Sequence, residues 1–174
     1  HKILAAIRAL EGGISFSGIV EADELLMKYS EKGRKFKNKE EYQKAKKKKH
    51  PKVAVLVVTD REGNLLFKQV GEKKVKNEQL REELKSRLSE NNLICVKPKK
   101  EFRKGVKGLQ SKKVIVNKRQ IKRGIYSVKI VENKISDFKT WLSKFHGVAT
   151  KYLQSYLMWF VIMNKYLKEL IDPD

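Results

Sequence analysis

The chain has 174 residues, with 41 Lys or Arg against 20 Asp or Glu, and its formal net charge is therefore +21. This length suits one domain with a buried core, while the single cysteine, Cys95, excludes a disulfide framework and a zinc site built from cysteines. No apolar run approaches the roughly 18 residues of a membrane span, so we expect a cytoplasmic protein without a membrane partner.

Two stretches carry the excess of positive charge. Residues 28–52 contain 12 Lys or Arg and three Glu, and residues 97–129 contain 13 Lys or Arg and only Glu101. The remainder of the chain is neutral. Two basic tracts on a neutral body predict a polyanionic partner, for which nucleic acid is the default. For either tract alone, lysines that merely solvate a surface are an equal alternative.

The first elements, in chain order, are a helix and a strand. Residues 1–7 have a helical pattern that ends at Gly12 and Gly13. Residues 18–24 alternate between apolar and polar side chains and predict a strand that ends on acids. Asp23 is the first acid expected to face a site; the alternative is that it caps a turn. The basic residues 28–52 show no periodicity and predict a mobile loop near nucleic acid, or a plain solvated loop.

A hairpin is expected next. Residues 53–59 form a continuous β-branched run, which is typical of a buried central strand. Gly63 and Asn64 predict a bend before a second strand at residues 65–70. Asp60 is interpreted as a turn residue rather than a metal ligand.

One helix and one more strand follow the hairpin. Residues 78–90 have leucines on one face and predict an amphipathic helix, with Asn77 as its N-cap. Residues 93–96 predict a short buried strand.

The C-terminal quarter carries a carboxylate and a lysine at a suggestive spacing. After the apolar run 125–131, Glu132 and Lys139 are seven residues apart. On a helix this is nearly two turns, so both side chains share a face about 10 Å apart along the axis. Such a face suits a metal ion and a DNA strand together, although Glu132 also fits as a favourable charge at a helix N-terminus.

The end of the chain contains a long motif, F-x-G-V-A-T-K-Y-L-x-x-Y-L-x-W-F, from Phe145 to Phe160. This motif resembles the end of the catalytic domain of bacterial insertion-sequence transposases of the DDE type, in particular the ISXO-like group. The segment around Asp23 is similar to the G-x-V-E-x-D-E of that family. The resemblance implies a ribonuclease H-like α/β fold, a mixed sheet flanked by helices in a single domain.

The resemblance also implies site residues and chemistry. Asp23 and Glu132 match the first and last catalytic carboxylates, which would hold Mg²⁺ or Mn²⁺ in a two-metal site. Lys139 matches a lysine that contacts DNA, and Lys151 lies in the closing motif as a second DNA-binding candidate. The family's second aspartate is replaced by Lys97, whose charge would repel the metals. Glu101 is a poor substitute, so this chain is expected to be catalytically impaired.

The chain departs from the family at one more position, and the resemblance implies a domain organisation and a role. Ser127 replaces the histidine that is usual in the family. Residues 1–14 are interpreted as the remnant of a helix linking to a missing N-terminal DNA-binding module, and residues 15–174 as the catalytic domain. The expected role is metal-dependent DNA cleavage and strand transfer on transposon ends and target DNA, with copies associating on DNA in the bacterial nucleoid. The alternative is a non-catalytic, basic remnant that binds nucleic acid.

Overall fold

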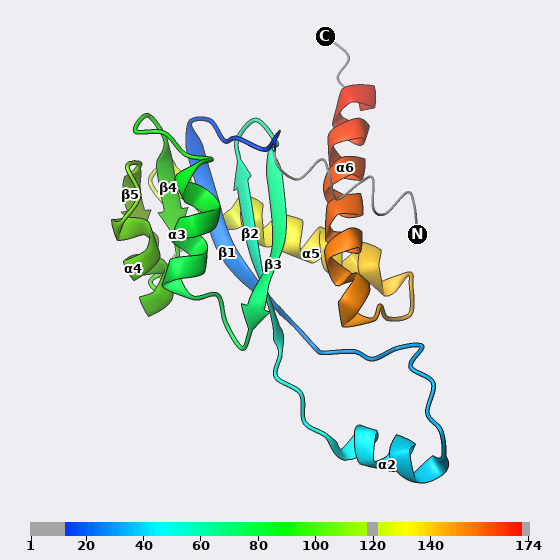
Figure 1. Cartoon of the computed structure of the whole chain (residues 1–174). Coiled ribbons are helices and arrows are strands. Elements are labelled where there is room, and N and C mark those ends of the chain that lie inside the picture. Colours follow the sequence, from blue (N-terminus) through cyan, green and yellow to red (C-terminus); the bar gives the residue numbers. More distant parts are fainter. Residues whose placement is uncertain (1–12, 118–121, 172–174) are drawn as a thin grey trace.

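A mixed five-stranded sheet organises the residues that the computed structural model describes, 13–117 and 122–171 (Figure 1). The strand order is β3-β2-β1-β4-β5, with antiparallel pairing among the first three strands and parallel pairing of β1 with β4 and of β4 with β5. The strands are β1 (Ile19–Met27), β2 (Val53–Asp60), β3 (Leu65–Glu72), β4 (Leu93–Val96) and β5 (Lys112–Ile115). The helix expected at residues 1–7 lies outside the described residues.

Helices cover both faces of this sheet. In β2, Val55 and Val57 pack with α5 and α6, while Leu56 and Val58 pack with α3 and α4. Such alternation follows from the two-residue period of a strand. The helices are α3 (Asn77–Lys85), α4 (Lys100–Lys107), α5 (Lys129–Ser143) and α6 (Leu153–Ile171), with a short 3₁₀ turn, η2 (Thr150–Tyr152), before α6. The expected α/β class with helices flanking a mixed sheet is therefore confirmed.

The aromatic residues of the closing motif belong to the core between α5 and α6. The Trp141 ring lies 5.5 Å from the Phe160 ring and 5.4 Å from the Trp159 ring, measured between centroids. Phe160 also contacts Phe67 of β3 at 5.5 Å. These rings pack the helices against the sheet.

The basic segment after β1 differs from the expected irregular loop, because it contains a helix, α2 (Lys39–Lys47). The Asn38 side chain caps this helix by accepting a hydrogen bond from the Glu41 backbone N–H at 2.8 Å. No residue of α2 is buried. A helix without an apolar stripe leaves no hydrophobic periodicity in the sequence, which explains the wrong prediction.

Two boundaries also differ from expectation. The helix expected at 78–90 ends at Lys85, and its first residue is Asn77, with Lys76 as the N-cap. The apolar run 125–131 is divided between a two-residue strand, β7 (Tyr126–Ser127), which pairs with β6 (Lys122–Arg123), and the start of α5. Among the described residues, no helix has the length and apolar character needed to cross a membrane.

Candidate functional site

Two parallel strands bring the first candidate residues together. In the pairing of β1 with β4, Ala22 lies opposite Val96. The residues that follow, Asp23 and Lys97, are therefore neighbours at the same level of the sheet. Asp23 is buried, with 4% of its surface exposed. A carboxylate buried to this extent requires compensating partners.

The Lys97 ammonium supplies one of those partners and reaches a second carboxylate as well. Its Nζ lies 2.6 Å from Asp23 Oδ2 and 2.5 Å from Glu132 Oε1. Glu132 stands in the first turn of α5. Asp23, Lys97 and Glu132 thus form one cluster built from β1, the end of β4 and α5.

A second lysine completes the pairing of Asp23. Lys99 Nζ lies 3.0 Å from Asp23 Oδ1 and 3.0 Å from Glu24 Oε1. Both oxygens of Asp23 are therefore bound to ammonium groups, one from Lys97 and one from Lys99. Neither Lys99 nor Glu24 was predicted as a site residue, although the Lys97-Pro98-Lys99 spacing after a buried strand is a usable signal.

The ion pairs keep Lys97 charged. Burial of its ammonium acts to lower the pKa, but the hydrogen bonds and charges of Asp23 and Glu132 outweigh this effect and raise the pKa above its ordinary value. The cluster thus groups three acidic side chains, Asp23, Glu24 and Glu132, around two lysines, Lys97 and Lys99.

Glu21 positions the helix that carries Glu132. It is fully buried, and its Oε2 accepts hydrogen bonds from the backbone N–H groups of Ile130 and Val131 at 2.8 and 3.1 Å. Its Oε1 accepts a hydrogen bond from Ser127 Oγ at 2.6 Å and lies 3.7 Å from Arg61 Nη2. A carboxylate at the N-terminus of α5 satisfies unpaired donors and favours the helix dipole.

This role of Glu21 was not predicted from the sequence, although the alternating pattern of β1 gives a usable signal for it. Glu21 and Asp23 are two residues apart and so face the same side of the sheet. On that side Glu21 fixes the start of α5 while Asp23 meets Glu132 through Lys97. Ser127 donates to Glu21 rather than joining the Lys97 cluster.

Cys95 lies opposite Glu21 in the sheet and is a buried free thiol. Burial, followed by the negative charge of Glu21, raises the pKa of Cys95 to about 11. The thiol is therefore neutral at physiological pH and unsuited to nucleophilic or metal chemistry.

The two lysines expected to contact DNA lie apart from the cluster. Lys139 is exposed on α5, two turns beyond Glu132, and forms no ion pair with any described residue. Lys151 is exposed in η2, with its Nζ 4.8 Å from the centroid of the Tyr152 ring. Lys151 lies near residues 29–34, which also line a small hollow there.

Two further acids are accounted for by other partners. Asp60 accepts hydrogen bonds from the backbone N–H groups of Glu62 and Asn64 at 3.0 and 2.9 Å, which confirms its interpretation as a turn residue. Glu101 is paired with Lys74, and this hydrogen bond lowers the pKa of its carboxyl group. Glu101 therefore faces Lys74 and does not share the Lys97 cluster.

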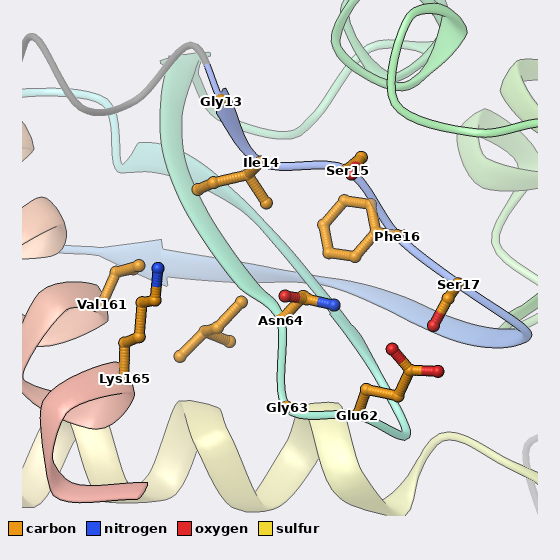
Figure 2. Close-up of a pocket in the computed structure, with 11 residues that line it drawn as sticks. Gly13, Ile14, Ser15, Phe16, Ser17, Glu62, Gly63, Asn64, Val161 and Lys165 are labelled. Atoms are coloured by element: carbon orange, nitrogen blue, oxygen red, sulfur yellow. The ribbon is translucent and has the colours of Figure 1, made fainter. Parts of the chain in front are cut away.

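A hollow beside the sheet is separate from this cluster. It has a volume of about 440 Å³ and lies between residues 13–17, the hairpin tip at residues 62–64 and the side chains of Val161 and Lys165 on α6 (Figure 2). Its lining includes neither Asp23 nor Glu132. The Lys97 cluster is thus partly buried and lies outside this hollow.

The donor set of the cluster does not fit a pair of divalent cations. Two-metal sites need several anionic oxygens free to ligate, whereas both oxygens of Asp23 and one of Glu132 are bound to ammonium groups. Within residues 13–117 and 122–171, no three acidic, histidine or cysteine side chains are grouped to hold a metal ion. A cation entering between Asp23 and Glu132 would meet the charge of Lys97.

The mixed five-stranded sheet flanked by helices is consistent with the ribonuclease H-like domain of DDE-type transposases. The family model of the ISXO2-like transposase domain matches residues 15–163, and the chain belongs to this family. A comparison with curated proteins found no match. Membership in this family assigns a transposase role with DNA as the partner, in a family that generally uses divalent metals.

Proposed function

We propose that this domain holds DNA during transposition but does not cut it, because Lys97 closes the cleavage site that Asp23 and Glu132 would form. The observation that carries the proposal is the position of Lys97 Nζ, 2.6 Å from one carboxylate and 2.5 Å from the other. Metal-dependent strand cleavage and transfer would be the activity of the site if the ammonium of Lys97 did not lie between Asp23 and Glu132.

The charge of Lys97 supports closure of the site by an ammonium group, which is more than the loss of one carboxylate ligand at position 97. A neutral residue at position 97 would leave Asp23 and Glu132 with net negative charge that attracts a cation. The ammonium of Lys97 instead offsets one of these two negative charges and, from its place between the carboxylates, excludes a second cation at contact distance. Lys99 strengthens this effect, since its Nζ is 3.0 Å from the other oxygen of Asp23.

In this proposal DNA is bound by residues outside the Asp23–Lys97–Glu132 cluster, so closure of the cluster does not prevent binding. The net charge of +21 favours a polyanion, and Lys139 and Lys151 are exposed. In this proposal Lys139 contacts the strand that passes over α5, and Lys151 contacts DNA near η2. The matched region, residues 15–163, covers most of the proposed catalytic domain at residues 15–174. A linking helix at residues 1–14, recognition of transposon ends, association of copies on DNA and location at the bacterial nucleoid stay predictions.

The test is nicking of supercoiled DNA in the presence of Mg²⁺ or Mn²⁺. The wild-type chain is compared with Lys97→Asp and with the double variant Lys97→Asp/Lys99→Gln, which also frees the second oxygen of Asp23. The control Lys100→Asp makes the same charge change at an exposed position on α4. Binding of the same DNA is measured in parallel at several salt concentrations.

We expect the wild type and the control to bind DNA without nicking it, and the double variant to nick it in a metal-dependent manner. Nicking by the wild type that is lost in Asp23→Asn would contradict the closure. If no variant nicks while all bind, the non-catalytic remnant becomes the better description. Absence of DNA binding by the wild type would refute the proposed function as a whole.

A further inference from the structure

A basic arm, residues 28–52, projects from the sheet between β1 and β2. Figure 1 shows its two legs leaving the strands and the helix α2 lying away from the sheet and from α5 and α6. Because no residue of α2 is buried, this helix contributes nothing to the core. Such a segment either binds a partner or is a plain solvated loop, and the contacts of its side chains distinguish these two alternatives.

The acids of the arm are used internally. Arg34 Nη1 lies 2.9 Å from Glu31 Oε2, and Arg34 Nη2 lies 3.1 Å from Glu41 Oε1. A hydrogen bond from the Lys37 backbone N–H, followed by the hydrogen bond from Arg34, lowers the pKa of the Glu41 carboxyl group. Only Glu40 remains to balance the lysines of the arm.

Those lysines are exposed and unpaired. Within the described part of the chain, none of ten arm lysines forms an ion pair: Lys28, Lys35, Lys37, Lys39, Lys44, Lys46, Lys47, Lys48, Lys49 and Lys52. Their mutual repulsion opposes the folded arm. A regularly charged polyanion removes this repulsion, whereas water and salt only weaken it.

The head of the arm is nevertheless held in a defined shape. Arg34 lies over the Phe36 ring at 5.0 Å, and the Phe36 and Tyr42 rings meet edge to face at 5.4 Å. Asn38 caps α2 within the same group of residues. Tyr42 is still 45% exposed, so an aromatic ring stands among the lysines of α2. These local contacts keep the charges on a helix rather than on a random loop.

The base of the arm is fixed to the closing motif. Ser30 and Thr150 exchange two hydrogen bonds, at 2.8 and 2.9 Å, and the Tyr29 and His50 rings stack at 4.2 Å. Lys32 Nζ donates to the carbonyl oxygens of residues 145–147 at 2.9 to 3.1 Å, at the C-terminal end of α5. A fixed base and a braced head give the arm a stable direction relative to the domain.

We propose that the basic arm grips the phosphate backbone of duplex DNA at a place apart from the Asp23–Glu132 cluster, as a second and sequence-independent contact. The inference rests on the proposed function in taking DNA as the polyanion. The exposed ammonium groups of α2 face the phosphates, and the arm holds a length of duplex that the candidate site does not touch.

The test compares two triple variants of equal charge. Lys44, Lys47 and Lys48 lie on one side of the end of α2, and replacing all three by Gln preserves helix propensity. The matched control replaces Lys73, Lys76 and Lys85 by Gln, which are exposed around α3. Binding to a labelled duplex of arbitrary sequence is measured between about 50 and 200 mM salt, and circular dichroism checks folding.

For the arm variant we expect a loss of affinity of about tenfold or more and a slope of log K against log salt that is less negative by about 2 to 3, because each lost phosphate contact contributes about 0.9. The control should keep the wild-type slope. Equal losses in both variants, or an unchanged slope in the arm variant, would overturn the proposal while leaving DNA binding intact. A wild type that binds no duplex would overturn the proposed function together with it.

Discussion

Lysine side chains have opposite roles in the Lys97 cluster and in the basic arm: they are paired with acids in the first and unpaired in the second. In the cluster, the ammonium groups of Lys97 and Lys99 lie between 2.5 and 3.0 Å from carboxylate oxygens. They form ion pairs with Asp23, Glu24 and Glu132. In the arm, ten exposed lysines have no acidic partner among the described residues. The net charge of +21 therefore overstates what the candidate site offers to DNA and understates what the arm offers.

The largest difference should appear when one carboxylate is removed from beside the cluster and another from the arm. Glu21→Leu leaves the N–H groups of Ile130 and Val131 without acceptors, and we expect it to lower the free energy of unfolding by about 3 kcal/mol. Glu40→Leu removes the same charge from α2, where the side chain is exposed, and should change it by less than about 0.5 kcal/mol. Urea denaturation measures both; similar losses would show that Glu21 does not hold α5.

Removing the central ammonium should have the next largest effect. Lys97→Met keeps the length of the side chain but leaves Asp23 with Lys99 alone, and the expected loss of stability is about 2 kcal/mol. Lys44→Met in the arm is the matched control and should be nearly neutral. Thermal unfolding distinguishes them, and a more stable Lys97→Met protein would mean that the desolvation of this cluster exceeds its attraction.

One lysine joins the arm to the rest of the domain, and its loss should have a smaller effect. Lys32→Met removes a cation that binds three carbonyl oxygens at the end of α5, and should lower the free energy of unfolding by about 1 kcal/mol. The control is Lys28→Met, at an exposed arm position without a partner among the described residues. Equal stability of the two variants would mean that Lys32 does not fix the base of the arm.

The smallest change in stability is expected from the arm lysines themselves. Replacement of Lys44, Lys47 and Lys48 by Gln should alter the free energy of unfolding by less than about 0.5 kcal/mol, because no buried contact is lost. Chemical denaturation of this variant, set beside its weakened DNA binding, would separate binding from folding. A large loss of stability would instead assign these residues a structural role.

Apolar patterns predicted the sheet well. The run at residues 53–59 and the bend at Gly63 and Asn64 correspond to β2 and its hairpin with β3, because burial and turn geometry leave direct signals in a sequence. β5 was not predicted, since Lys112 and Lys113 are exposed in it and hide its strand character. α2 was missed for a related reason: its stability rests on Asn38 and on helix propensity, without an apolar stripe.

The candidate site was only partly accessible from the sequence. A lysine at position 97 implied repulsion of metal ions, but the sequence does not say where its ammonium lies. Its bridge between Asp23 and Glu132 depends on the parallel pairing of β1 with β4 and on the position of α5, both long-range features. The roles of Glu21 and Lys99 depend on the same arrangement, so they emerge only from the fold.

The most direct test of the central claim is a Mn²⁺ titration of the free protein, followed by electron paramagnetic resonance of the unbound ion. Closure of the site by ammonium groups predicts that the wild type binds no Mn²⁺ at this cluster and that Lys97→Asp/Lys99→Gln does. The control Lys100→Asp/Lys104→Gln, at exposed positions of α4, should behave as the wild type. Tight binding by the wild type that disappears in Asp23→Asn would contradict the closure of the site by Lys97.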